Sequence, residues 1–407
     1  MNFILLSILL SIIGVAGCVP ASPYQVKFTQ PDNSTFYGYV RGDERASYVE
    51  TSDYVIERGQ DKWWKYVKND PQGNLVITDF KVGMVDPKKV GVPSKTTLQS
   101  NLKTSLIHVN GKMQLSTAQK APALGTAECV VILIKFSDVG QGSTHTSSYY
   151  NYLLFNSGNP KSMQSYYNEV SYGNLNLEGT ASKWYQSSKT MKYYGEDSGI
   201  FDNDDKNTNI YELTREAVRL ANNDIDFSQY DKNGDHVVDH VIIVHAGGAQ
   251  ESSGNPDDIW SHKWSIPGDG EQVDGVKVRQ YTMLAEDSPM GTFAHEFGHD
   301  LGLPDLYDTD RSSEGVGEWD LMGSGNWLGD VNTPGSTPGH LSAWCKFVLG
   351  WVNPIKVTSS MLGEQIDNIE NNNRAYMLSA NPNNEYGEYF LVENRKKIGY
   401  QAVSKPF

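Results

Sequence analysis

The stretch that decides the fold is Thr292-Phe293-Ala294-His295-Glu296-Phe297-Gly298-His299-Asp300-Leu301-Gly302-Leu303-Pro304-Asp305. It contains the pattern His-Glu-x-x-His, and on a helix His295 and His299 leave the same face one turn apart. That spacing suits two corners of a metal tetrahedron. Glu296 follows the first histidine, where it can contact a metal-bound water without binding the metal itself. The pattern therefore predicts a helix that carries a metal site.

The residues after this helix predict a third ligand. Gly302 can adopt the positive φ that ends a helix, and Pro304 does not easily continue one. The chain therefore turns back and can bring Asp305 round as an oxygen ligand. Two imidazoles, one carboxylate and an open fourth position are typical of a catalytic zinc site.

Two alternatives use the same residues. The pattern is short and also occurs by chance on ordinary amphipathic helices. Two histidines and one carboxylate can also hold non-haem iron for oxygen chemistry. Glu296 favours hydrolysis, because an oxygenase has no need of a carboxylate over the bound water.

Several segments together resemble a known family. Residues 295–308 resemble the zinc signature of the immune inhibitor A type (M6) metalloproteases, which belong to the metzincins. Further segments that resemble the catalytic domain of this family are 162–173, 244–247, 259–264 and 319–325, and segments 38–44 and 51–57 resemble its propeptide. The resemblance implies an α+β fold, with a zincin or metzincin-like catalytic domain of mixed β-sheet and zinc-binding helix after a small β-rich propeptide. It also implies that Met322 packs under the ligands without coordinating.

Composition excludes some classes of function. The chain has 407 residues, a formal net charge of -15 and 38% hydrophobic residues. Length allows two or three domains with a sizeable core. The acidic balance argues against nucleic acid as a partner and fits a soluble secreted protein. We expect a monomer. Cys18, Cys129 and Cys345 are too few for a disulfide scaffold, and Cys129 and Cys345 are either paired or buried thiols.

The N-terminus has the features of an export signal. Residues 3–16 form an apolar run too short to span a bilayer, followed by small residues, so 1–17 are predicted to be a signal peptide. Cleavage after Gly17, or nearer Ser22, would give a secreted protein. The sequence before Cys18 also matches a lipoprotein cleavage site, so a lipid anchor on Cys18 is the alternative. No other segment is apolar enough to span a membrane.

The rest of the chain divides into three predicted parts. Residues 18–124 form a β-rich propeptide and connector, with alternating runs at 35–41 and 48–58 and an exposed connector at 93–124. Residues 125–355 form the catalytic domain. It has buried strands at 130–136 and 237–246 and helices at 162–170, 209–222 and about 337–350. Residues 356–407 form a C-terminal β segment with strands at 376–378 and 389–393, which we expect to be incomplete.

A second metal site is predicted between the helix at 209–222 and the next strand. Asp231, Asn233 and Asp235 alternate around Gly234, as at the start of a calcium loop, and Asp239 can replace the missing terminal glutamate. The alternative is a solvated turn before a strand. A calcium ion here would be structural.

Four further histidines and two other residues are candidates for supporting roles. We expect His245, His262 and Glu251 to support the site or line the cleft, and His240 to be structural. Tyr307 or His340 is a candidate for stabilising the substrate carbonyl oxygen.

These features predict a secreted zinc-dependent endopeptidase, made as a zymogen. In the predicted mechanism His295, His299 and Asp305 hold zinc, and Glu296 is the general base for the attacking water. Its partners would be protein or peptide substrates and its own propeptide. The alternative is a catalytically inactive zincin-fold module for secreted binding or adhesion.

Overall fold

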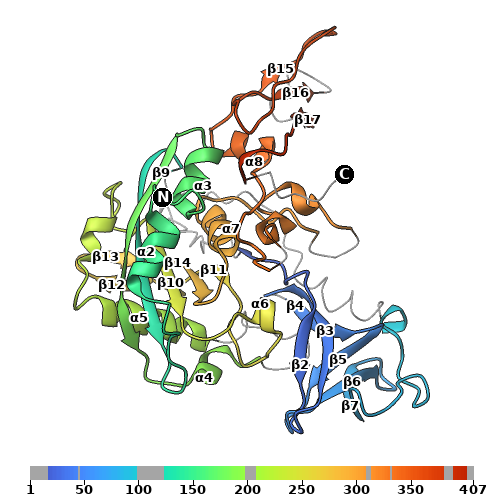
Figure 1. The fold of residues 1–407 in the computed structure, drawn as a ribbon. Coiled ribbons are helices and arrows are strands. Elements are labelled where there is room, and N and C mark those ends of the chain that lie inside the picture. Colours follow the sequence, from blue (N-terminus) through green and yellow to red (C-terminus); the bar gives the residue numbers. More distant parts are fainter. Residues whose placement is uncertain are drawn as a thin grey trace, which may run out of the picture.

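The computed structural model describes residues 17–44, 46–98, 123–197, 208–308, 313–330, 332–379 and 388–400. Most of the predicted signal peptide and of the connector lies outside the described residues. The described chain is a mixed α/β protein with an N-terminal β-sheet, a central body that contains α7 (Met290–Asp300), and a small C-terminal sheet (Figure 1).

The N-terminal sheet is a six-stranded antiparallel meander in which each strand pairs with the next. Its strands are β2 (Val26–Thr29), β3 (Thr35–Asp43), β4 (Ala46–Thr51), β5 (Tyr54–Arg58), β6 (Trp64–Asn69) and β7 (Leu75–Lys81). The run predicted at 48–58 is two strands, because Ser52 has a φ of 54° and turns the chain between β4 and β5. Phe28, Val40 and Trp64 lie in the buried core of this sheet.

The central sheet has the strand order β1-β11-β14-β10-β8-β9. Its strands are β1 (Gly17–Cys18), β8 (Gly125–Lys135), β9 (Leu175–Gln186), β10 (His240–His245), β11 (His262–Ser265) and β14 (Gln280–Ala285). The strands β14, β10, β8 and β9 are parallel, whereas β11 is antiparallel to β14 and β1 is antiparallel to β11. β8 and β10 include the apolar runs predicted as buried strands. β12 (Glu271–Val273) and β13 (Val276–Val278) form a separate hairpin.

Helices cover both faces of the central sheet. The helices are α2 (Ser147–Phe155), α3 (Met163–Val170), α4 (Met191–Gly195), α5 (Asn209–Ala221), α6 (Gln250–Ser253), α7 (Met290–Asp300) and α8 (Ala343–Val348). Alternate residues of β8 point to opposite faces. Val131 and Leu133 therefore pack in one core with α2, α3 and α7, and Val130 and Ile132 pack in another with α5. The parallel strands and α3 thus hold α7 from one side.

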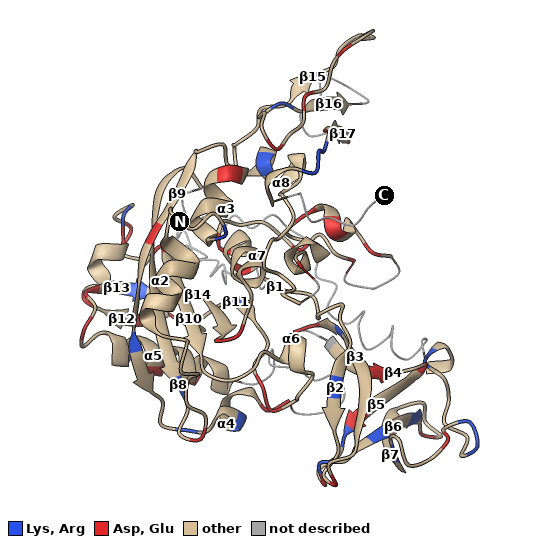
Figure 2. Cartoon of the chain, in the orientation of Figure 1, with Lys and Arg blue, Asp and Glu red and all other residues tan. Residues whose placement is uncertain are grey.

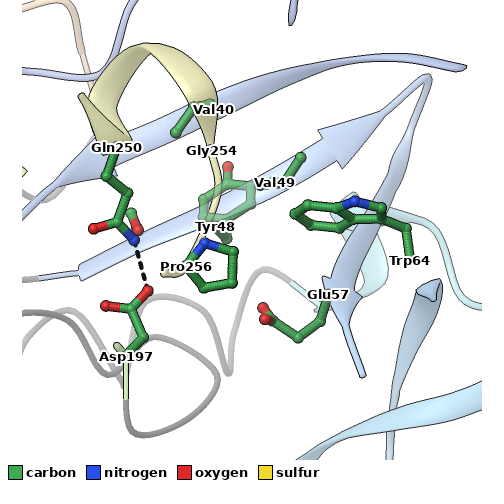
Figure 3. Close-up of a pocket in the computed structure, with 10 residues that line it drawn as sticks. Val40, Tyr48, Val49, Glu57, Trp64, Asp197, Gln250, Gly254 and Pro256 are labelled. Carbon is green, nitrogen blue, oxygen red and sulfur yellow. Dashed lines mark hydrogen bonds between the residues drawn. The ribbon is translucent and has the colours of Figure 1, made fainter. Parts of the chain in front are cut away.

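The N-terminal sheet packs against the central body near α6. Gly254 follows α6 with a φ of 62°, and a Cβ there would lie 2.8 Å from Val40, so the two parts approach closely. Arg58 of β5 donates to Asn255 and pairs with Asp257 at 3.1 Å. Beside this contact, residues of β3, β4 and β5 line a small pocket together with Asp197, Gln250 and Pro256, and Gln250 donates to Asp197 (Figure 3).

The C-terminal sheet contains β15 (Ile355–Lys356), β16 (Tyr376–Ser379) and β17 (Tyr389–Val392). The two longer strands match the predicted ones. The helix predicted at about 337–350 is shorter, because α8 begins at Ala343 after an N-cap at Ser342.

Two surface properties bear on possible partners. Lys and Arg residues are spread over the N-terminal sheet, the central body and the C-terminal sheet (Figure 2). Within the described part of the chain, no helix is both long and apolar enough to cross a lipid bilayer.

Candidate metal centre

Helix α7 carries the His-Glu-x-x-His pattern, and every one of its residues is buried. It begins after Pro289, which takes the N-cap position without a side-chain capping hydrogen bond. It ends as predicted, because Gly302 has a φ of 92° and reverses the chain. The backbone of Leu303 donates to Gly298, which closes this turn.

The turn brings Asp305 beside the two histidines. The Nε2 atoms of His295 and His299 are 3.0 Å apart, and Asp305 Oδ1 lies 3.2 and 3.1 Å from them. A tetrahedral ion with bonds of about 2.0–2.1 Å would separate its ligand atoms by roughly 3.3 Å. The three side chains therefore fit a metal ion. The Glu296 carboxylate lies beside the two histidines, close enough that its oxygen could also reach an ion held there.

Two main-chain carbonyls orient the imidazoles. Nδ1 of His295 lies 2.8 Å from the carbonyl oxygen of Leu321, and Nδ1 of His299 lies 2.8 Å from that of Leu303. Each Nδ1 must carry the hydrogen in such a pair, which leaves the Nε2 lone pair facing the ligand cluster. Sequence reasoning missed these two partners, because any residue can supply a carbonyl.

Met322 packs against α7 between the two ligands. It is fully buried, and a Cβ added to Gly298 would lie 2.6 Å from its Sδ atom. The structure thus places Met322 beneath the helix turn that carries both histidines, where the family resemblance put it. Gly298 is needed for this approach because any side chain would meet the sulfur.

Glu296 is buried beside the ligands. It is 0% exposed, and the backbone amide of Val19 is the group whose hydrogen bonding acts on its carboxylate. Burial raises the pKa of Glu296 well above its usual value, and the charges of Asp305, Glu44 and Glu251 raise it further. Burial would also raise the pKa of Asp305, but the charges and hydrogen bonds of His299 and His295 outweigh burial and lower it.

The first described residues of the chain occupy the space in front of the ligands. β1 adds to the edge of the central sheet by pairing with β11, in the register Gly17 to Lys263 and Cys18 to His262. The Cys18 carbonyl oxygen lies 3.0 Å from Nε2 of His295. Position 17 has no room for a side chain, since a Cβ there would lie 2.5 Å from the His299 ring. Sequence reasoning missed this strand.

Of the two candidates for binding a carbonyl oxygen, only Tyr307 reaches the site. Its hydroxyl lies 3.2 Å from the Cys18 carbonyl oxygen and 3.3 Å from a carboxylate oxygen of Asp43. His340 is buried elsewhere, with its Nδ1 near the carbonyl of Leu341, and the structure does not bring it to the ligands.

The three remaining candidate histidines, His240, His245 and His262, are packed into the core. His245 lies against Phe136, and the structure gives it no place among the ligands. Burial lowers the pKa of His245 to about 4 and that of His262 to about 3. His240 pairs with Asp300 at 2.5 Å, which agrees with a structural role.

His262 lies opposite Cys18 in the sheet and Glu251 lies beside Ser22, and a supporting role for both stays a prediction. His262 stacks on Trp264 within β11, the strand that β1 joins. The Glu251 carboxylate accepts a hydrogen bond from the amide of Ser261, and its main-chain carbonyl accepts one from the amide of Ser22. Burial raises the pKa of Glu251 to about 7.

The predicted calcium residues lie together in the loop before β10. Asp231 accepts hydrogen bonds from the amides of Gly234, Asp235 and His236. Asp239 accepts from the amide of Lys232 and from the Asn233 side chain. Calcium binding at Asp231, Asn233, Asp235 and Asp239 stays a prediction.

The cysteines carry thiols rather than disulfides. Cys18, Cys129 and Cys345 are all buried. Of the two alternatives for Cys129 and Cys345, the structure has buried thiols, and Cys345 donates to Asp320. Burial raises the pKa of both thiols well above the usual value.

Comparison with known proteins identifies relatives of this chain. Residues 127–352 match the family model described as "Immune inhibitor A peptidase M6, catalytic domain". The pre-pro-metalloprotease PrtV of Vibrio cholerae is 35% identical over 253 residues, which cover 51% of this chain and 27% of PrtV. Immune inhibitor A of Bacillus thuringiensis subsp. alesti is 27% identical over 336 residues, which cover 67% of this chain and 49% of that protein. The chain thus spans between a quarter and a half of the length of these relatives.

Proposed function

The chain belongs to the immune inhibitor A family of M6 peptidases, and from this premise we propose that it is a zinc-dependent endopeptidase with a zincin-like catalytic domain. The observation that carries the proposal is the ligand set. His295, His299 and Asp305 place two nitrogens and one oxygen 3.0–3.2 Å from one another, with the Glu296 carboxylate beside them. Two histidines, one carboxylate and an open position suit zinc in a hydrolytic site.

Each residue of the site would have a different role in hydrolysis. A bound zinc ion would lower the pKa of a water to about 7 and polarise the substrate carbonyl. Glu296 would accept a proton from the attacking water at a carboxylate oxygen and return it to the leaving amine. Tyr307 would donate a hydrogen bond to the carbonyl oxygen as negative charge develops there, since its hydroxyl already reaches a carbonyl in that place.

We also propose that the protein is made as a latent precursor, with 18–124 as propeptide and connector. The support is β1 (Gly17–Cys18), which pairs with β11 as an added strand and holds the Cys18 carbonyl oxygen against the ligands, and the Ser22 amide, which donates to the Glu251 carbonyl. A substrate that enters as an extended strand would need the same edge of β11. The segment therefore excludes substrate by occupying its place.

The leader favours export of this precursor. Removal of 1–17 by signal cleavage would leave Cys18 as the first residue, in front of the ligands. The Cys18 side chain is fully buried in this arrangement, which supports a secreted protein over one with a lipid on that thiol.

Hydrolysis of casein tests the proposed activity. We would compare the chain freed of its residues up to about 124 with its Glu296→Gln variant, both loaded with zinc. Activity only in the first supports a metallopeptidase with Glu296 as the base, whereas equal activity in both would refute it. No activity in either, with folded protein and bound zinc, would favour the non-catalytic binding module. Metal analysis that finds iron would favour the oxygenase alternative.

A further inference from the structure

Two tryptophans of the central body bind the segment that fills the cleft. Trp260 is fully buried just before β11, and Trp327 is 4% exposed at the end of the 3-10 helix η4 (Ser324–Trp327). The indole Nε1 of Trp260 donates to the Val19 carbonyl at 3.0 Å, and that of Trp327 donates to the Pro20 carbonyl at 3.0 Å. Both donors thus bind main-chain atoms of the N-terminal segment.

The metal ligands show where these carbonyls lie relative to the bond that would be cleaved. The Cys18 carbonyl oxygen lies against His295, so the peptide bond between Cys18 and Val19 is the one at the reaction centre. β1 runs antiparallel to β11, as an extended peptide does when it adds to a sheet edge. Val19 and Pro20 are therefore the first and second residues after the bond at the ligands.

We propose that Trp260 and Trp327 form the substrate subsites for the first and second residues after the scissile bond. The inference rests on the proposed peptidase function. When the N-terminal segment leaves the cleft, both indole N–H groups lose the acceptors they have in this structure. Both tryptophans are buried while the segment is in place, and the main-chain carbonyls of an entering peptide would offer the same kind of acceptor to the same N–H groups.

The chemistry of the two contacts defines a substrate class. Main-chain carbonyls are common to all peptides, so the contacts favour peptides that extend at least two residues beyond the scissile bond, whatever their side chains. Pro20 has no amide hydrogen, so the second subsite binds its residue without one. The second position should therefore accept proline.

Peptides of graded length test the assignment in the full chain after activation by limited proteolysis. Two peptides share one sequence, and one ends as an amide at the first residue after the scissile bond whereas the other continues by one residue. The wild type should cleave the longer peptide with a kcat/KM about three- to tenfold higher, the effect of one hydrogen bond. Trp327→Phe should abolish this preference and leave the shorter peptide unaffected. Trp260→Phe should slow both peptides alike.

Trp351→Phe is the matched control, because its indole donates to the Ala123 carbonyl outside the cleft, and it should keep the length preference. A third peptide tests the same contact without a protein variant. It has the length of the longer peptide, but a methylene replaces the carbonyl of the second residue after the scissile bond, and wild type should cleave it with the kcat/KM of the short peptide. Two results would overturn the subsite assignment and leave the proposed function standing. One is an equal loss of kcat/KM on the short and the long peptide in Trp327→Phe, and the other is cleavage of the methylene peptide by wild type as fast as the long peptide. Failure of activated wild type to cleave any peptide or casein would overturn the proposed function together with the subsite assignment.

Discussion

Replacing Glu57 by Gln should remove part of the pH dependence of the unfolding free energy. This part arises where the N-terminal sheet packs against the central body. Glu57 is in β5 and lines the pocket between the two parts, opposite Pro256 and Asp197 (Figure 3). Glu57 keeps part of its surface exposed, and the loss of hydration in this pocket raises its pKa to about 7, whereas the amide of Arg58 lowers it. The charged groups around it are Arg58, Lys62, Lys192, Glu196, Asp197 and Asp257.

The sign follows from proton binding. In the unfolded chain the carboxyl ionises near pH 4.5, whereas in the folded protein it keeps its proton to about pH 7. The folded state therefore binds more protons between these values, and the free energy of unfolding falls as pH rises through that range. A rise of the pKa from 4.5 to about 7 corresponds to a loss of about 3 kcal/mol. The amide of the Glu57→Gln variant is uncharged at all pH values, so the variant should avoid this loss.

Urea denaturation of the full chain from pH 5 to pH 8 measures the effect. The difference in unfolding free energy between Glu57→Gln and wild type should grow by about 2 to 3 kcal/mol in favour of the variant. Glu178→Gln, at an exposed position of β9, is the matched control and should run parallel to wild type. Parallel curves for Glu57→Gln and wild type would refute the reasoning, because they would mean that Glu57 is ionised in the docked state.

Four further predictions concern the metal centre and the loop before β10. Asp305→Ala should sharply lower zinc occupancy measured by elemental analysis, and unchanged occupancy would show that it is not a ligand. Gly298→Ala should cost about 1–3 kcal/mol of unfolding free energy by overpacking Met322, and the same substitution should cost less when Met322 is already Ala; an equal cost in both backgrounds would disprove the contact. Tyr307→Phe in the activated protein should lower kcat about 100-fold or more with zinc retained, and an unchanged kcat would remove its role at the carbonyl. Millimolar Ca²⁺ should raise the Tm of wild type but not of Asp235→Asn, and equal shifts would place any calcium elsewhere.

The metal centre could be predicted because its chemistry lies in side chains at fixed spacing. His295 and His299 are four residues apart on a helix, and the glycine that ends the helix places Asp305. The apolar runs in β8 and β10 could be predicted for a similar reason, since both strands are buried on both faces. β9 was missed because its residues alternate between buried and exposed with glycine and serine among them, which weakens the apolar pattern.

The choice between Tyr307 and His340 shows where side-chain patterns stop being sufficient. Either residue has the chemistry to bind a carbonyl oxygen. Only the fold decides, because the turn after Asp305 brings Tyr307 to the site, whereas His340 is buried near Lys346 and Arg395. Their charges, after burial, help to lower the pKa of His340 well below its usual value, so it is neutral there.

The strand β1 was missed for a deeper reason. Gly17 and Cys18 stand at the end of the predicted leader, where small residues indicate a cleavage site. Beside the β pairing with β11 and the buried side chains of Cys18 and Val19, the polar contacts described above at Cys18, Val19 and Pro20 are made by main-chain carbonyls. Any residue supplies such a group, so no side-chain pattern records the contact. Recognition of main-chain carbonyls also lets the segment mimic a substrate. A site that binds carbonyls can bind many sequences, including a segment of the same chain.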